Sequence, residues 1–466
     1  MSPAPQPPVN AWLAGTVAVD IAMASQASAD ALAALRTQRL AQLLGSAAKR
    51  SPLYRRVLKG RDPGAWRLED LPVFHKTELM QHFDEWVAHP GIRLEAVQQF
   101  VSDRRRIAEP FLGRYTVWES SGSTGQPAVF VEDASAMAVY DALEALRRPV
   151  LRPLQQWLDP WRLGDRIAFV GATGGHFAST VSIERLRRLN PVLAGRLRGI
   201  SFMQPVEHIL EALHAFAPTV IATYPTCAVL LAEERMEGRL RLSLHEMWTG
   251  GEDLSAAKRE FVKRAFDCPV SNSYGASEFL PLASECDRGH LHLNSDWVIL
   301  ESVDAEGRSV PPGETGATTL LTNLANHVQP LIRYDLGDRI TVHARPCACG
   351  SHLPVIEVQG RSDDTLRLGR AGSGSVRVLP LALSTTLEED AGLFDFQLVQ
   401  EGPCELLLRT GLRGAEANVA LQRAHRVLGE FLKSQGAVGV HIRCRSGEAG
   451  KAGRSGKVQR VVACTT

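Results

Sequence analysis

The sequence predicts an α/β protein with a large N-terminal domain and a small C-terminal domain. Its 466 residues exceed what one ordinary hydrophobic core supports, so at least two domains are expected. Short apolar strands alternate with helices from residue 128 to 278, which is typical of a layered α/β domain. Residues 290–360 change to a β-rich pattern, and the residues beyond them differ in composition. We therefore expect domains at 1–360 and 361–466, the first with a β-rich subregion and the second α+β.

The expected elements can be placed in chain order. Leucines on one helical face predict a helix from Asp30, which Ser51-Pro52 breaks. Residues 71–76 are interpreted as a short linker that carries no chemistry. A strand at 166–170 runs into a glycine-rich turn, where open α/β sheets bind ligands, so His176 is either a substrate contact or a loop histidine. The remaining expectations are helices at 134–151, 225–236, 255–266, 388–390 and 415–432, and strands at 219–223, 245–249, 269–272, 292–294, 297–301, 318–322 and 339–342.

Composition narrows the classes of function. A hydrophobic content of 44% and a charged content of 22% are those of a soluble globular protein. The net charge of +1 gives no indication of a nucleic-acid or anionic-membrane partner. No apolar run reaches the ~18–20 residues of a membrane span. Residues 11–24 faintly resemble the core of a signal peptide, but Asp20 interrupts them and no basic flank precedes them. We therefore expect a cytoplasmic protein.

One glycine-rich stretch is a candidate ligand site. It runs Ser120-Ser121-Gly122-Ser123-Thr124-Gly125 and is bounded by Trp118 and the apolar run 128–131. Glycines let successive backbone N–H groups turn toward an anion, and the hydroxyl groups add further donors. No Gly-Lys-Ser/Thr follows, so the stretch differs from the Walker phosphate loop. A flexible linker is the alternative, but the apolar residues on both sides favour an ordered phosphate loop.

Five segments resemble one family when they are taken together and in order. They are residues 120–127, 274–278 (Tyr-Gly-Ala-Ser-Glu), 333–338 (Arg-Tyr-Asp-Leu-Gly-Asp), 360–364 (Gly-Arg-Ser-Asp-Asp) and 456–460 (Gly-Lys-Val-Gln-Arg). Their order and spacing resemble the adenylate-forming superfamily, specifically its phenylacetate–coenzyme A ligase branch. The resemblance covers most of the chain. It implies that the N-terminal domain is an AMP-binding, adenylating domain and that the C-terminal domain is a mobile lid.

The resemblance implies an acid–thiol ligase that uses ATP and Mg²⁺. In this family a carboxylic acid and ATP give an acyl adenylate and pyrophosphate, and the thiol of coenzyme A then captures the acyl group. A carboxylate is a poor electrophile, and its approach to the α-phosphate brings two anions together. The site must therefore neutralise charge and hold the groups in position. The branch implies an aryl or arylacetic acid as the substrate.

The resemblance also implies roles for individual residues. Lys457 would bridge the substrate carboxylate and the α-phosphate, a task that suits a mobile ammonium group. Glu278 would bind Mg²⁺, which favours carboxylate and phosphate oxygens. Asp338 would hydrogen-bond the ribose hydroxyls, and Arg361 would contact ribose or phosphate. The other nucleotide contacts would be Ser120, Ser121, Gly122, Ser123, Thr124 and Gly125 around the β- and γ-phosphates, and Gly250, Gly251, Glu252, Ser273, Tyr274 and Gly275 beside the adenine.

The lid carries one match and one departure. Family members rotate this domain between the two half-reactions, and Asp363 matches the hinge position. Residues 366–375 are polar and glycine-rich, where the family has an apolar strand and a loop of the thiol tunnel. This departure weakens the prediction that coenzyme A binds more than the prediction that ATP binds, because the loop belongs to the thiol tunnel. Taken singly, Glu278 is also compatible with a surface carboxylate, Asp338 with a turn residue and Lys457 with a solvated tail.

A second cluster has the composition of a metal site. Cys347 and Cys349 can present two thiolates from one turn, and Cys286 and His292 could complete a tetrahedral, structural Zn²⁺ site. Similar positions occur in some members of the branch, with His292 as the expected ligand and His290 as the alternative. Unrelated thiols and surface histidines are the other interpretation. The 8 cysteines are too sparse for a disulfide framework.

Several points remain open at this level. The acyl group could pass to a carrier-protein thiol, or the enzyme could transfer AMP alone. A catalytically silent scaffold homologue is a further alternative, which the presence of Glu278, Asp338 and Lys457 disfavours. The sequence does not determine the acid, the acceptor or the oligomeric state, with a homodimer among the options.

Overall fold

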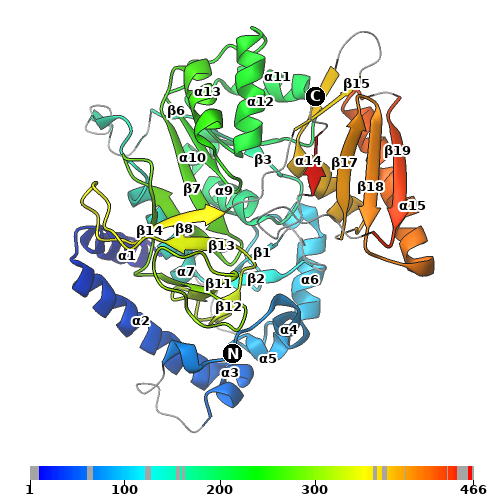
Figure 1. Cartoon of the computed structure of the whole chain (residues 1–466). Coiled ribbons are helices and arrows are strands. Elements are labelled where there is room, and N and C mark those ends of the chain that lie inside the picture. Colours follow the sequence, from blue (N-terminus) through cyan, green and yellow to red (C-terminus); the bar gives the residue numbers. More distant parts are fainter. Residues whose placement is uncertain are drawn as a thin grey trace.

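The computed structural model describes most of the chain. It shows a central mixed sheet with helices around it and, beside them, a C-terminal part with its own sheet (Figure 1). This architecture confirms the predicted α/β class, the β-rich subregion and the small α+β C-terminal part. The described residues are 10–59, 67–120, 127–153, 158–159, 162, 164–359, 365–369, 375–393, 395–437, 439–448 and 460–463.

Within the described residues the central sheet has nine strands, in the order β13-β14-β9-β8-β7-β6-β5-β3-β4. The five strands from β7 to β4 run parallel, and the others pair antiparallel. Parallel strands are covered on both faces, so short apolar runs such as Ala-Phe-Val in β3 suffice to form them. The strands are β3 (Ile167–Gly171), β4 (Leu197–Ser201), β5 (Val220–Thr223), β6 (Glu246–Gly250), β7 (Val270–Ala276), β8 (Phe279–Glu285), β9 (Leu291–Leu293), β13 (Arg339–Val342) and β14 (Val355–Gln359).

The sequence-based expectations hold for four of the parallel strands. The predicted strands at 166–170, 219–223, 245–249 and 269–272 overlap β3, β5, β6 and β7. Strand β4 adds to the prediction, because this edge strand carries an arginine and a glycine and so lacks a continuous apolar run.

Helices α11, α12 and α13 pack on the parallel strands. Their apolar side chains form one core cluster with Ile221 of β5 and Met247 of β6 (Figure 1). The side chain of Ser255 caps α13 by accepting a hydrogen bond from Lys258 N–H. Helix α7 ends at Leu146, earlier than the predicted 151. The helices around the sheet are α7 (Ala134–Leu146), α9 (Ala178–Leu189), α10 (Pro191–Arg196), α11 (Val206–Phe216), α12 (Pro225–Met236) and α13 (Ala256–Phe266).

The N-terminal helices pack against the β-rich region. Arg39 of α2 is buried, pairs with Asp296 at 3.3 Å and stacks on the Trp297 ring at 3.6 Å. Among the helices that the structure describes, none combines the length and the apolar character of a membrane span. The elements are α1 (Ala11–Ala24), α2 (Ala29–Arg50), α3 (Pro52–Val57), η2 (Leu68–Asp70), α4 (Lys76–Gln81), α5 (Phe83–Trp86), α6 (Leu94–Ser102), η3 (Arg104–Arg106), β1 (Thr116–Glu119), β2 (Val129–Glu132), β10 (Val298–Val303), β11 (Thr318–Asn323) and β12 (Tyr334–Asp335).

The C-terminal part has its own apolar core. Leu398, Leu406 and Leu428 belong to a buried cluster between the sheet β19-β18-β17-β20 and helix α15 (Figure 1). Gln435 ties this part to the rest of the chain by donating a 2.7 Å hydrogen bond to the Met203 carbonyl. Its elements are β15 (Leu366–Gly369), β16 (Ser375–Val378), α14 (Pro380–Thr385), η4 (Thr386–Asp390, one π-helical turn), β17 (Gln397–Gly402), β18 (Glu405–Thr410), α15 (Gly414–Ser434), β19 (His441–Ser446) and β20 (Val461–Val462).

Candidate active site

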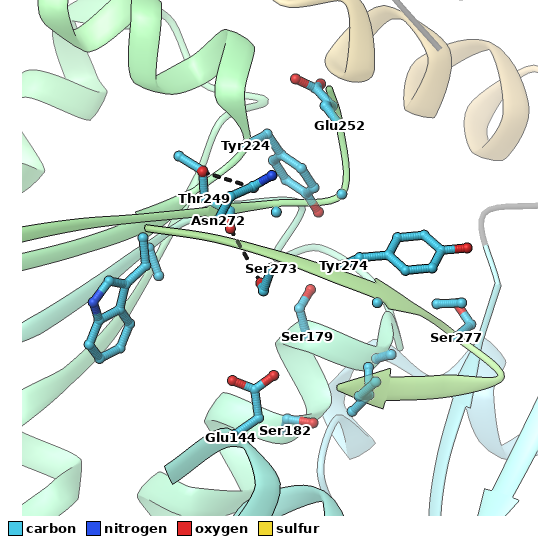
Figure 2. A pocket seen from close by; sticks show the side chains of 18 of the residues that line it. Glu144, Ser179, Ser182, Tyr224, Thr249, Glu252, Asn272, Ser273, Tyr274 and Ser277 are labelled. Carbon is cyan, nitrogen blue, oxygen red and sulfur yellow. Dashed lines mark hydrogen bonds between the residues drawn. The ribbon is translucent and has the colours of Figure 1, made fainter. Parts of the chain in front are cut away.

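A large cavity opens at the carboxyl ends of the parallel strands. Its volume is about 1860 Å³. Thr223 of β5, Gly250 of β6 and Tyr274 of β7 line it, together with residues of α7 and α9 (Figure 2). Open α/β sheets bind ligands at this edge because loops of neighbouring strands diverge there. Glu388 and Arg460 add the C-terminal part to the lining.

Ser120, the first residue of the glycine-rich stretch, lines this cavity. Its backbone N–H donates to the Ala128 carbonyl at 2.8 Å, and its Oγ accepts from the Ala128 N–H at 2.9 Å. The two bonds extend the β1–β2 pairing by one residue pair, Ser120 and Ala128. Ser121, Gly122, Ser123, Thr124 and Gly125 lie outside the described residues.

The glycines beside the cavity are required by close approaches of the backbone. A Cβ at Gly250 would lie 2.9 Å from the Ser273 hydroxyl. Gly251 has a φ of +79° and its Cβ would meet the Tyr224 ring at 2.9 Å. A Cβ at Gly275 would collide with the Leu280 carbonyl oxygen.

Tyr274 and Asp338, which the resemblance assigns to the adenine and the ribose, contact each other in the cavity. The Tyr274 hydroxyl donates a 2.7 Å hydrogen bond to Asp338 Oδ2. Burial raises the pKa of Tyr274, and the neighbouring Asp338 carboxylate raises it further, so the hydroxyl stays protonated. Ser273, which precedes Tyr274, also lines the cavity and donates from its hydroxyl to the Thr249 carbonyl at 3.3 Å (Figure 2).

Glu278 lies in the turn between β7 and β8 and also lines the cavity. Burial raises the pKa of its carboxyl group, while a hydrogen bond from Tyr334 and the charge of Lys76 lower it. Its backbone carbonyl accepts a 3.0 Å hydrogen bond from Asn323 Nδ2. The Glu278 carboxylate is therefore held within the cavity, not on the outer surface.

Lys76 is a cavity residue that the sequence interpretation missed. Residues 71–76 form more than an inert linker, because the backbone of Phe74 pairs with Arg333 and Asp335 at 3.0 and 2.9 Å and so brings Lys76 to the cavity. Burial lowers the pKa of Lys76, and the charges of Glu278 and Glu388 raise it. One feature of the sequence could have drawn attention to Lys76: lysine is rare in this chain, with only 8 lysines among the 52 basic residues.

Glu252 has a structural task besides its place in the cavity lining. Its carboxylate oxygens accept hydrogen bonds from the Thr226 N–H at 2.9 Å and the Thr226 hydroxyl at 3.0 Å. A carboxylate that receives the N–H groups of a first helical turn stabilises that helix end, here of α12. The side chain of Glu252 therefore connects the loop after β6 to this helix (Figure 2).

The C-terminal part reaches the cavity through Arg460. This buried arginine pairs with Glu388, and its guanidinium lies 5.0 Å from the centre of the Phe396 ring. Three residues singled out by the resemblance, Lys457, Arg361 and Asp363, lie outside the described residues.

His176 is not a lining residue of the cavity. It is fully buried and lies edge-on against Phe100, with 5.6 Å between the ring centres. Burial lowers the pKa of its imidazole, which favours the neutral ring. The neighbouring Phe177 lines the cavity instead. The structure therefore disfavours a substrate contact by His176.

The four predicted metal ligands come together at the β8–β9 turn. Potential ligand atoms of Cys286, His292, Cys347 and Cys349 all lie within 4.8 Å of one another. His292 Nδ1 is 2.9 Å from the Leu353 carbonyl, which fixes the tautomer that leaves Nε2 for a metal, and Nε2 is 3.4 Å from the Cys349 sulfur. The donor set of three thiolates and one imidazole suits Zn²⁺. His290, the alternative ligand, is 3.2 Å from the Cys347 sulfur.

The known proteins that this chain resembles include enzymes of the kind that the cavity residues suggest. The model of the AMP-binding enzyme family matches residues 119–320. Phenylacetate-coenzyme A ligase of Escherichia coli (strain K12) is 26% identical over 356 residues, which cover 73% of this chain and 73% of that protein. Fatty acid–[acyl-carrier-protein] ligase ScoC of Streptomyces coeruleorubidus is 29% identical over 217 residues, 44% of this chain and 39% of ScoC. Protein CapK of Staphylococcus aureus is 27% identical over 178 residues, 36% of each chain. The matches to ScoC and CapK thus span little more than a third of those proteins.

A solved structure extends the likeness to both parts of the chain. The structure of 2-hydroxyisobutyryl-CoA ligase, in complex with 2-HIB-AMP and CoA in the thioesterification state, superposes with a TM-score of 0.58 at 21% identity. It covers 94% of this chain and 91% of that one, which shows a shared fold. The family model over residues 119–320, the relatives and the ordered motifs all agree with an AMP-binding enzyme of the adenylate-forming superfamily, and the shared fold is compatible with it.

Proposed function

We propose that the chain is an AMP-forming acid–thiol ligase. It activates a carboxylic acid with ATP to an acyl adenylate and then transfers the acyl group to a thiol. The observation that carries the proposal is the convergence of Ser120, Glu278 and Asp338 on one cavity, although they come from three distant segments. Each of the three matches a different motif of the superfamily.

The triphosphate would lie between Ser120 and Lys76. Donors of the glycine-rich stretch suit the β- and γ-phosphates, and the Lys76 ammonium brings a positive charge to the same side of the cavity as Glu278. Glu278 would hold Mg²⁺, since its carboxylate supplies the oxygen ligands that this ion prefers. When bound, Mg²⁺ neutralises phosphate charge that would otherwise repel the acid.

The ribose would lie beside Asp338. Tyr274 fixes the orientation of the Asp338 carboxylate through its 2.7 Å hydrogen bond, so the carboxylate can accept hydrogen bonds from the ribose hydroxyls. The adenine would lie against the backbone of Gly250, Gly251 and Gly275, where larger side chains are excluded. A pre-oriented acceptor loses less free energy on binding than one that must reorganise.

Adenylation and thiolation then follow as two displacements. An oxygen of the substrate carboxylate attacks the α-phosphorus, the bond to the bridging oxygen breaks and pyrophosphate leaves. The thiolate of the acceptor next attacks the acyl carbon, and AMP leaves with the electron pair of the broken C–O bond. Lys457 would neutralise the two anions in the first step, and Arg361 would contact ribose or phosphate.

We assign residues 1–360 to the adenylation domain and 361–466 to a mobile lid. The separate apolar core between the C-terminal sheet and α15 supports this division. Asp363 would be the hinge that changes its dihedral angles between the two half-reactions.

Coenzyme A is the acceptor that we favour. The match to phenylacetate-coenzyme A ligase covers 73% of both chains, whereas the match to ScoC, whose name describes an acyl-carrier-protein ligase, covers 39% of that protein. A carrier-protein thiol is therefore the second candidate. Phenylacetate-like aryl acids are the first substrates to test for the same reason.

Exchange of radiolabelled pyrophosphate into ATP over a panel of acids tests the first half-reaction. Acid-dependent exchange is the expected result, and its absence with every acid would favour a silent scaffold homologue. Adding coenzyme A or a carrier protein and detecting the thioester by mass spectrometry then identifies the acceptor. Lys457→Ala should abolish exchange, while thiolation of a supplied acyl adenylate survives. Equal loss of both half-reactions would contradict the role of Lys457.

We further propose a structural Zn²⁺ at Cys286, His292, Cys347 and Cys349. The support is the approach of all four ligand atoms within 4.8 Å and the hydrogen bond that orients His292. A closed set of four protein ligands leaves no open position for a substrate, so the ion would hold the β8–β9 turn to the loop at 347–350 without a part in catalysis.

A further inference from the structure

We infer that the acid carries a hydrogen-bond donor, a hydroxyl or neutral amino group remote from its carboxylate, and that Glu144 binds this donor. The inference rests on the proposed function and names the class of acid that the same cavity takes. It concerns the side of the cavity formed by α7 and α9, away from Glu252 (Figure 2).

Glu144 presents a carboxylate oxygen to the cavity. It lines the cavity from α7, and Arg148, one turn later, binds only its Oε2. Among the described residues, none hydrogen-bonds to Oε1. Figure 2 shows the Glu144 carboxylate pointing into the open centre, on the opposite side of the strands from Glu252. Displacing water from a carboxylate costs free energy unless a donor on the ligand replaces it.

Further polar groups surround this position. Ser179 and Ser182 of α9 lie on the same side of the cavity as Glu144 (Figure 2). The buried Ser182 hydroxyl has no hydrogen-bond partner among the described residues. Asn272 of β7 also lines the cavity, with its Oδ1 accepting from the Thr249 hydroxyl at 3.0 Å. An unsubstituted hydrocarbon ring would leave the Ser182 hydroxyl and the Glu144 Oε1 unsatisfied, whereas a hydroxyl or amino group can hydrogen-bond to them.

A neutral donor suits this place better than a cation. Arg148 already balances the charge of Glu144, and it is fixed by stacking 4.4 Å from the centre of the Trp248 ring. A second positive charge on the ligand would therefore repel Arg148. Trp248 itself lines the cavity and adds apolar surface beside this position, although Arg148 and Arg162 both lie over its ring. Together these groups favour a hydroxylated or aminated aryl acid.

Pyrophosphate exchange with seven matched acids tests the inference. We would compare phenylacetic, 4-hydroxyphenylacetic, 4-aminophenylacetic and 4-methoxyphenylacetic acids, and the 3-substituted isomers of the last three. At least one hydroxy or amino acid should exceed phenylacetic acid in kcat/KM by about 10-fold or more, because a site built around a hydrogen bond rejects analogues that lack it. Its methoxy counterpart, which has similar shape but no donor, should lose that advantage.

Variants of Glu144 then assign the preference to this side chain. Glu144→Leu should reduce the ratio between the preferred acid and phenylacetic acid to within about threefold, and Glu144→Gln should keep part of it because an amide oxygen still accepts. Glu260→Gln, on the exposed face of α13, is the matched control and should keep the wild-type ratio.

The outcomes separate this inference from the function on which it rests. Equal exchange with phenylacetic acid and all its donor-bearing analogues in the wild type would overturn the inference. The proposed ligase function would not be affected by that result. An unchanged ratio in Glu144→Leu would overturn the role of Glu144. Absence of exchange with every acid would instead overturn the proposed function. If Glu144→Leu fails to fold, the wild-type ratios and Glu144→Gln still decide.

Discussion

The hydroxyl of Tyr274 donates a 2.7 Å hydrogen bond to Oδ2 of Asp338, and this bond joins two segments that lie far apart in the chain. Tyr274 belongs to β7 in the middle of the central sheet, whereas Asp338 immediately precedes β13 at an edge of the same sheet. The bond therefore fixes one side of the cavity relative to the other. Nucleotide binding should therefore depend on this hydrogen bond more than on the local structure around Tyr274 or around Asp338.

Tyr274→Phe should raise the KM for ATP about 10-fold, and Asp338→Ala about 100-fold. A hydrogen bond to a charged group is worth roughly 1.5–3 kcal/mol, which corresponds to these factors. Steady-state pyrophosphate exchange measures both. Tyr115→Phe is the control, because the buried Tyr115 hydroxyl has no hydrogen-bond partner among the described residues and lies outside the cavity lining. A KM for ATP unchanged in Asp338→Ala would contradict the ribose assignment.

Lys76→Met should lower kcat/KM for ATP by about 10- to 100-fold, with partial recovery in Lys76→Arg. The ammonium lies among Glu278, Glu388 and Arg460 and would compensate phosphate charge there. Lys59→Met, at an exposed lysine outside the cavity lining, should match the wild type. Equal activity of Lys76→Met and the wild type at subsaturating ATP would contradict the role of Lys76 in compensating phosphate charge.

Gly275→Ala should destabilise the fold by roughly 1–3 kcal/mol or more, since the new Cβ collides with the Leu280 carbonyl oxygen in a rigid strand pairing. Gly45→Ala is the opposite case. It lies within α2 with nothing inside 4 Å of the added Cβ, so alanine should stabilise the helix by up to ~1 kcal/mol. Urea denaturation followed by circular dichroism compares the two. The close-approach argument fails if both variants have the stability of the wild type.

His292→Ala should lose the bound zinc, whereas His290→Ala should retain it. The His292 imidazole is oriented by the Leu353 carbonyl, while the exposed His290 contacts only the Cys347 sulfur among the predicted ligands. Elemental analysis of protein purified without chelator measures the stoichiometry, expected near one zinc per wild-type chain. A wild-type content of only trace zinc would refute the site.

Glu389→Gln should remove part of the loss of stability that the wild type suffers between about pH 5 and 8. Burial and the nearby Glu119 raise the pKa of the Glu389 carboxyl group to about 8, well above its value in an unfolded chain. A raised pKa contributes stability that is fully present below the unfolded pKa and is lost as the pH rises through the folded pKa of about 8. The difference in Tm between Glu389→Gln and the wild type should therefore grow from about pH 5 to 8 and change little above that. Glu260→Gln is the control, and a difference independent of pH would contradict the prediction.

The sequence predicted the central sheet well, because its parallel strands are buried on both faces and appear as short apolar runs. It did not predict β4, whose edge position tolerates Arg198 and Gly199, nor the antiparallel strands β8 and β14. Helix α7 was expected to extend to 151 and ends at Leu146, before Pro149. Local signals of this kind define an element but not its exact end, which packing decides.

The residues of the candidate site likewise fall into those that the sequence could predict and those that it could not. Ser120, Tyr274, Glu278 and Asp338 were predictable because each belongs to a recognisable motif, and the cavity confirms that they lie together. Lys76 and Glu144 belong to no such motif. Their importance depends on which segments pack beside β7, which no local pattern of residues reports.

By itself, the sequence determined the α/β class and indicated the superfamily through its motif residues, because short runs of residues with fixed chemistry encode them. Only the tertiary structure decided that Lys76 joins the cavity, that Glu144 faces its centre and that His176 is buried against Phe100. These relationships arise from strand pairing and helix packing between distant segments. Their energies depend on contacts across the fold, so they exist only once the whole chain has folded.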